Sequence, residues 1–133
     1  MATEILINDG GAPARIIPFT MKAATTCTAG MALSLHSDGT VVPADTDLGA
    51  AGGQAFIGIA LTAAVAGGIV NVITGSGVVV MALCTAENLG VGLELSAAAG
   101  TLDAYTGAYP ASGQPVAVTL EGTGAGLTKV LLL

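Results

Sequence analysis

The sequence predicts an all-β fold, a compact barrel or sandwich of short strands. Short apolar runs rich in Val, Ile and Leu recur along the 133 residues, and Gly-containing turns separate them. Parts of this pattern also occur twice, in the same order. A chain of this length forms one domain and can bury a core without a metal or disulfides. We therefore expect one compact β-barrel or β-tulip-like domain built from two similar halves.

The first 24 residues are predicted to form an extended N-terminal arm. The segment 8–11 (NDGG) and the prolines Pro13 and Pro18 disfavour a helix and favour an extended path. The β domain is then expected to span residues 25–133.

The first predicted element of this domain is a hairpin. Met31, Leu33 and Leu35 alternate with other residues, the turn 37–39 (SDG) follows, and residues 41–42 (VV) return. Seven further strands are expected between Gly-containing turns, at residues 55–61, 68–74, 77–84, 90–96, 100–105, 114–121 and 127–133.

Residues 52–83 carry no charged side chain, so a membrane span, a buried helix and a set of buried strands all have to be weighed. The stretch 55–73 is long enough to cross a bilayer. However, its glycines and β-branched pairs favour strands and turns, and the nearest basic residues are Lys22 and Lys129. We predict strands buried on both faces and no membrane association.

The internal repeat places two similar halves at about residues 27–73 and 84–131. Both copies begin with Cys-Thr-Ala, continue with Gly-x-x-Leu-x-Leu, and then contain Gly-Thr followed by an aliphatic residue. Chance similarity in a chain rich in Gly, Ala and Val is the alternative to duplication. Under duplication, the strand 77–83 (GVVVMAL) joins the two halves.

Composition indicates a protein that works in an assembly. Charged residues make up 9% of the chain and hydrophobic residues 53%, so part of the surface must be apolar and uncharged. Nine carboxylates against three basic residues give a net charge of −6, which disfavours nucleic-acid binding. Residues 1–20 contain no basic segment followed by an apolar one, so no secretory signal is expected.

Few side chains could support chemistry, and we predict neither an enzyme nor a cofactor or metal site. His36 is the only histidine and flanks a turn. Glu94 and Glu121 lie in alternating segments and are expected to face solvent or a neighbouring subunit. Cys27 and Cys84 could form a disulfide, but free buried thiols are the expectation for a chain with no secretory signal.

Five segments carry a resemblance to a known family: 28–35 (TAGMALSL), 38–44 (DGTVVPA), 56–61 (FIGIAL), 66–72 (AGGIVNV) and 130–132 (VLL). In style and order they resemble the small Gly/Ala-rich decoration, or cement, proteins of tailed-phage capsids, and more distantly the lambda head decoration protein. The apparent duplication and the scarcity of aromatic residues depart from the lambda-like pattern.

This resemblance implies a structural protein on the outer surface of the virion, made in the host cytoplasm. Its partners would be the major capsid protein and copies of itself, commonly as homotrimers at local threefold positions. In such proteins a terminal arm often reaches onto the capsid. The residues that would provide this contact are Ile5, Ile7, Arg15, Ile16, Ile17 and Phe19.

A glycan- or receptor-binding module on a virion is the rival function. Such sites usually use aromatic side chains, and Tyr105 and Tyr109 lie together in a loop rich in Gly and Pro. We therefore retain these two tyrosines as a possible exposed contact.

Overall fold

The computed structural model describes residues 5–7, 13–44, 55–85, 89–96, 98–105, 115–122 and 125–133. The prediction of an all-β fold is confirmed, since every regular element among these residues is a strand. The strands are β1 (Arg15–Thr20), β2 (Ala32–Leu35), β3 (Val41–Pro43), β4 (Ala55–Ala60), β5 (Ile69–Thr74), β6 (Val79–Cys84), β7 (Gly92–Leu95), β8 (Leu102–Ala104), β9 (Ala117–Thr119) and β10 (Gly126–Leu132).

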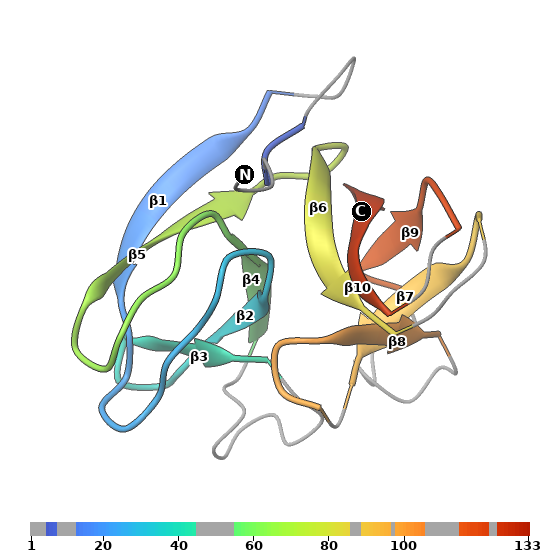
Figure 1. The fold of residues 1–133 in the computed structure, drawn as a ribbon. Coiled ribbons are helices and arrows are strands. Elements are labelled where there is room, and N and C mark those ends of the chain that lie inside the picture. The colour runs from blue at the N-terminus through green and yellow to red at the C-terminus, as the bar shows by residue number, and fades with distance from the viewer. Residues whose placement is uncertain are drawn as a thin grey trace.

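These strands form two sheets that lie side by side (Figure 1). The first sheet has the order β1-β5-β4-β2-β3. The second has the order β6-β10-β9-β7-β8 and closes into a barrel, because β6 also pairs with β8. All named strand pairs are antiparallel except β6 with β8.

The two sheets have the same topology, strand for strand. Each first strand pairs with the fifth strand of its half, the fifth with the fourth, the fourth with the second, and the second with the third. The two edge strands of the first half, β1 and β3, also approach each other: the Lys22 amide, just after β1, donates to the Val41 carbonyl of β3 at 3.0 Å. In the second half the matching bond runs from the Thr85 amide to the Leu102 carbonyl at 2.9 Å. The two halves predicted from the sequence repeat therefore share one chain path.

The bounds of the halves differ from those predicted. The first half begins with β1, and the second begins with β6. Residues 77–83, which the sequence presents as a linking strand, fall mainly in β6, the first strand of the second half. The halves are therefore 15–74 and 79–132 rather than 27–73 and 84–131.

The N-terminal segment is not the arm separate from the β domain that the sequence predicts for residues 1–24. β1 pairs with β5 along all six of its residues. Ahead of it, the Met81 amide donates to the Ile5 carbonyl at 2.8 Å, and the Ile7 amide donates to the Val79 carbonyl at 3.2 Å. Backbone pairing and the burial of Ile5 and Met21 hold these segments to the body of the protein. The path is extended, as predicted, but it belongs to the sheets.

Two apolar clusters form the core. One lies inside the first half and includes Met21, Leu33 and Val72. The larger one joins the halves: it combines Ile59 and Ile73 with apolar residues from every strand of the second half. Neighbouring residues of β4 and β5 therefore enter different clusters, and both faces of these strands are buried.

This arrangement explains the uncharged stretch 52–83. Strands that are buried on both faces read as continuous apolar sequence rather than as alternating sequence. Among the residues that the structure describes, no helix has the length and hydropathy needed to cross a membrane.

Candidate interaction surface

The strand β1 presents an exposed apolar surface at the edge of the first sheet. Ile16 and Ile17 are 48% and 39% exposed, and Arg15 and Pro18 are exposed beside them. Phe19 is half-buried and packs against the cluster inside the first half. Four of the six predicted contact residues, from Arg15 to Phe19, thus lie on this one strand.

The other two predicted contact residues have different surroundings. Ile5 is only 4% exposed and belongs to the core that joins the halves. Ile7 is half-buried next to β6. Ile5 is therefore not available as an anchor for a partner, because moving it would uncover the core.

Pro18 fits β1 because this strand lies at the edge of its sheet. The Met21 amide donates to the Gly68 carbonyl on the β5 side, so backbone groups of alternate residues, Pro18 and Thr20 among them, point to the opposite edge. Proline has no N–H to donate, which restricts it to such edge positions. It also removes one donor that another strand could use.

Ile69, at the start of β5, extends the apolar surface of β1. It lies opposite Thr20 in the register, while Ile16 lies opposite Ile73, so the side chains of Ile16, Thr20 and Ile69 point to the same face. Ile69 is 61% exposed. We call the set Ile16, Pro18, Thr20 and Ile69 the outer β1 surface, because alternation places Pro18 on the same face.

Sequence reasoning missed Ile69 as a surface residue. Its signal is the alternation in β5, where Ile69 and Asn71 share one face and Val70 and Val72 share the other. A polar residue on one face of an apolar strand indicates that this face is not wholly buried.

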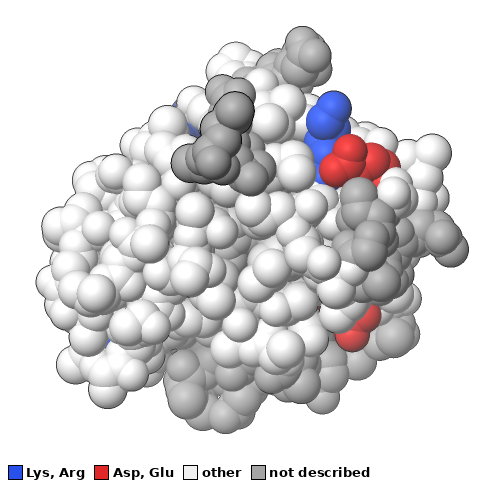
Figure 2. Space-filling model, viewed as in Figure 1, with Lys and Arg blue, Asp and Glu red and all other residues white. Residues whose placement is uncertain are grey.

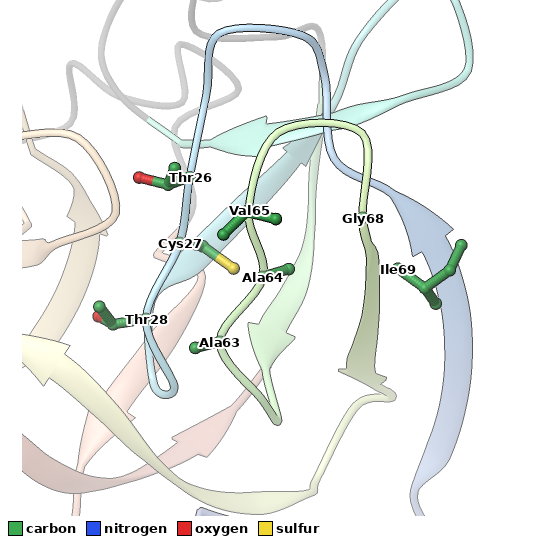
Figure 3. A pocket seen from close by; sticks show the side chains of 8 residues that line it. All are labelled: Thr26, Cys27, Thr28, Ala63, Ala64, Val65, Gly68 and Ile69. Carbon is green, nitrogen blue, oxygen red and sulfur yellow. The ribbon is translucent and has the colours of Figure 1, made fainter.

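A hollow of about 540 Å³ lies beside Ile69 (Figure 3). It is lined by Thr26, Cys27, Thr28, Ala63, Ala64, Val65, Gly68 and Ile69. The Cys27 sulfur points toward Ala64 (Figure 3) and lies 3.8 Å from the Thr62 carbonyl oxygen. Burial raises the pKa of the Cys27 thiol, so the neutral form is favoured there. The lining is suited to contact with small apolar groups.

Both cysteines are buried and unbridged, as expected. They also occupy different places in their halves, although each begins a Cys-Thr-Ala segment. Cys84 ends β6, whereas Cys27 lies after β1 in an isolated bridge to Ala64. The Cys-Thr-Ala match is therefore not a structural correspondence.

Of the two tyrosines retained as a possible contact, Tyr105 lies among the described residues. Tyr105 is half-buried after β8, and its amide donates to the Gly92 carbonyl at 2.8 Å. Tyr109 lies outside the described residues.

Glu94 and Glu121, the two acidic residues singled out in the sequence, are buried or half-buried within the fold. Glu94 is 5% exposed, which corrects the expectation that it faces solvent. It lies opposite Asp103, whose Oδ1 accepts a hydrogen bond from the Thr85 hydroxyl at 2.9 Å. Glu121 is half-buried, and its Oε1 accepts from the Lys129 amide at 3.0 Å. In the described part of the chain, no three His, Cys, Asp or Glu side chains come together as a metal site would require.

The turn between β2 and β3 contains a small polar cluster. Lys22 Nζ lies 2.9 Å from Asp38 Oδ2, and His36 Nδ1 lies 3.2 Å from Asp38 Oδ1. The Thr40 hydroxyl and amide also donate to Asp38 Oδ1. These hydrogen bonds, with a smaller contribution from Lys22, hold the pKa of Asp38 well below its ordinary value of 3.8. Asp38 is exposed, and Lys22 and His36 are partly exposed beside it.

We expect Asp38→Asn to reduce stability at neutral pH and to have a progressively smaller effect as pH falls below the ordinary pKa of aspartate. A carboxylate with a lowered folded pKa stabilises the fold above its unfolded pKa, and this contribution is lost as pH falls through the folded value. Urea unfolding at pH 7 and below about pH 3 measures the difference between wild type and variant. Thr40→Val removes the hydroxyl that donates to Asp38. In a protein that carries Thr40→Val, the loss of stability caused by Asp38→Asn at pH 7 should therefore be smaller. An equal difference at both pH values would contradict this assignment.

No protein-family model and no curated protein sequence matches this chain.

Proposed function

We propose that the protein is a capsid decoration, or cement, protein that binds the outside of a phage head and stabilises the shell. The observation that carries the proposal is the outer β1 surface, an exposed apolar surface on a strand that is fully paired with β5. Its partner would be the major capsid protein, and its copies would stand as homotrimers at local threefold positions.

Paired backbone makes this surface suitable for docking. A free arm loses conformational entropy when it binds, whereas a strand that is already held in a sheet loses little. We therefore assign the capsid contact to Ile16 and Pro18 rather than to a loose arm. Ile5 keeps a structural role in the core of the protein.

The remaining surface suits a role in assembly. Among the described residues, Figure 2 shows few charged side chains on this face: Lys or Arg adjoins Asp or Glu at the upper right, and another acidic group lies lower on the right. The chain has nine acidic and three basic residues, so electrostatic attraction to nucleic acid would be weak. Contact through apolar and backbone groups is the interaction that such a surface offers.

Shell stabilisation would follow from repetition of a weak contact. Copies that bind the assembled lattice, and not its separated subunits, shift the equilibrium toward the intact shell. Symmetry multiplies each contact over many sites, and a copy that touches two capsid subunits gains further from multivalency. No reactive group is needed for this function.

The test is a copy-number measurement in purified phage particles, followed by reconstitution on particles that lack the protein. We expect a copy number comparable to that of the major capsid protein, and a shell that withstands higher temperature when decorated. Ile16→Glu should reduce occupancy at least about tenfold, because a carboxylate would be desolvated in the contact. Leu133→Glu, at a residue that is 55% exposed away from β1, is the matched control.

A few copies per particle, or none, would contradict the proposal and favour a fibre, a receptor-binding module or a protein outside the virion. Equal occupancy by wild type and Ile16→Glu would contradict the assignment of the contact to the outer β1 surface.

A further inference from the structure

The contact between the two halves uses a different surface on each half. Three backbone hydrogen bonds cross it: Leu83 N–H to Gly30 O at 2.8 Å, Ala32 N–H to Gly100 O at 2.9 Å, and Gly100 N–H to Ala44 O at 2.7 Å. We call Gly30, Ala32 and Ala44 face A of the first half. Face B of the second half consists of Leu83, Gly100 and Leu127.

Gly30 lies where the two faces meet, and its φ of 92° favours glycine there. Leu127 of β10 packs directly over it, and a Cβ added to Gly30 would lie 2.3 Å from Leu127 Cδ2. The amide of Leu83 reaches the Gly30 carbonyl at the same place. Face A is therefore a small-residue surface that receives a leucine, a strand edge and a turn.

Because the two halves share one topology, each half has a counterpart of the other's face. The bond from Ala44 N–H to Ala32 O recurs as Tyr105 N–H to Gly92 O, with donor–acceptor distances of 2.9 and 2.8 Å. Glycines with positive φ at 30 and 90 precede the matching strands β2 and β7. The second half thus has its own face A, formed by Gly90, Gly92 and Tyr105.

The counterpart of face B lies on the first half. Thr20 pairs with Ile69 in β1 and β5, as Leu83 pairs with Leu127 in β6 and β10. Gly39 stands in the β2–β3 turn, as Gly100 stands in the β7–β8 turn. The first half therefore has a face B formed by Thr20, Gly39 and Ile69.

Both counterpart faces are open. Ile69 is 61% exposed, and Leu89, next to Gly90, is 68% exposed. Among the described residues, nothing lies within 4 Å of a Cβ built on Gly90 or on Gly39, in contrast to the covered Gly30. Each half thus uses one face in the contact with the other half, and its second face stays uncovered by the described residues.

We propose that a second copy of this chain fills these faces, head to tail. Face B of the first half of one copy binds face A of the second half of the next copy. Ile69 covers Gly90 as Leu127 covers Gly30, the Thr20 amide donates to the Gly90 carbonyl, and the Gly92 amide donates to the Gly39 carbonyl. Such a contact joins unlike surfaces, so it builds a ring where the rotation closes and a filament where it does not.

The contact between copies is weaker than the one inside the chain. The Gly39 amide donates to His36 O within its own turn, at 3.0 Å, and is not free to repeat the bond that Gly100 makes to Ala44. The turn also carries the charged Asp38, where the second half has Ala99. Two of the three backbone hydrogen bonds remain, which predicts reversible association that depends on concentration.

The inference goes beyond capsid binding, because it concerns the free chain and names the residues that join one copy to the next. Light scattering coupled to size-exclusion chromatography, over a concentration series up to about 1 mM, tests it, since a contact with millimolar Kd would be half populated there. The wild type should move from 12.8 kDa to integer multiples of that mass. Ile69→Lys and Leu89→Lys should each remain monomeric, with circular dichroism spectra like that of the wild type.

Mixing the two variants tests the head-to-tail geometry. Ile69→Lys keeps an intact face A and Leu89→Lys keeps an intact face B, so an equimolar mixture should form a dimer and nothing larger. Leu133→Lys, the control at an exposed residue outside both faces, should associate like the wild type. A wild type that stays at 12.8 kDa, variants that still associate, or a mixture that stays monomeric would overturn the inference. Any of these results would leave the copy number on the capsid as a separate question.

Discussion

Gly58→Ala is expected to lower the free energy of unfolding by at least about 3 kcal/mol, with a fall in Tm of roughly 10 °C or more. A Cβ on Gly58 would lie 2.1 Å from the Ile73 carbonyl oxygen, and a backbone atom cannot rotate away as a side chain can. Relief would require β4 and β5 to separate where Ile59 and Ile73 enter the core that joins the halves. Thermal unfolding followed by far-UV circular dichroism measures the effect.

The shape of β4 explains why the backbone comes so close. Leu33 pairs with Gly58 but Ser34 pairs with Phe56, so one extra residue of β4 forms a bulge against β2. Bulges bend a strand sharply, and glycine within a strand often marks such a bend. The Ile73 carbonyl fills the space that a side chain at 58 would need.

Gly39→Ala is the matched control for this substitution. Gly39 also has a positive φ, of 86°, but nothing lies within 4 Å of an added Cβ. Its cost is therefore limited to the backbone conformation, about 1–2 kcal/mol. Equal losses for Gly39→Ala and Gly58→Ala would show that conformation alone, and not the approach of β5, makes glycine necessary at 58.

Sequence patterns predicted the local elements of this fold well, because alternation and turn residues act over short range. The hairpin around residues 37–39 corresponds to β2 and β3, and each of the seven further predicted strands overlaps an observed strand. The Gly-x-x-Leu-x-Leu and Gly-Thr matches fall in β2–β3 and β7–β8, which are equivalent.

Long-range pairing was not predictable from these patterns. Pro18 interrupts the alternation of residues 15–20, and only the position of β1 at a sheet edge makes a proline acceptable there. The sequence match between Cys27 and Cys84 shifted the repeat alignment and hid the equivalence of β1 and β6. Gly58 lies inside the predicted strand 55–61, but the bulge beside it, which depends on the pairing of β4 with β2, was not predicted.

The candidate surface was predicted in part, for a similar reason. Ile16 and Ile17 are exposed on β1, where they could serve as contacts, whereas Ile5 is taken up by the core. The alternation in β5 indicated that Ile69 and Asn71 share one face, but not that Ile69 lies uncovered beside β1. Whether an apolar residue in a strand is covered depends on which strand lies across from it, and neighbouring sequence does not carry that information.

Ile73→Ala is expected to destabilise both halves together, by about 2–5 kcal/mol. The side chain is fully buried in the core that contains residues of both halves, so its loss leaves a cavity between them. Because each half completes its core with the other, the protein should unfold in one cooperative transition.

The near-UV signal of tyrosine reports on the second half alone. Both tyrosines, at 105 and 109, belong to the second half of the sequence, whereas the substitution lies in β5 of the first half. The near-UV signal of tyrosine and the far-UV signal of all strands should therefore share one midpoint, and Ile73→Ala should lower both equally. Leu133→Ala, at an exposed residue, should change the free energy of unfolding followed by either signal by no more than about 0.5 kcal/mol. If the tyrosine signal kept its wild-type midpoint while the far-UV signal fell in two steps, the halves would be independent folding units, and the shared core would not couple them.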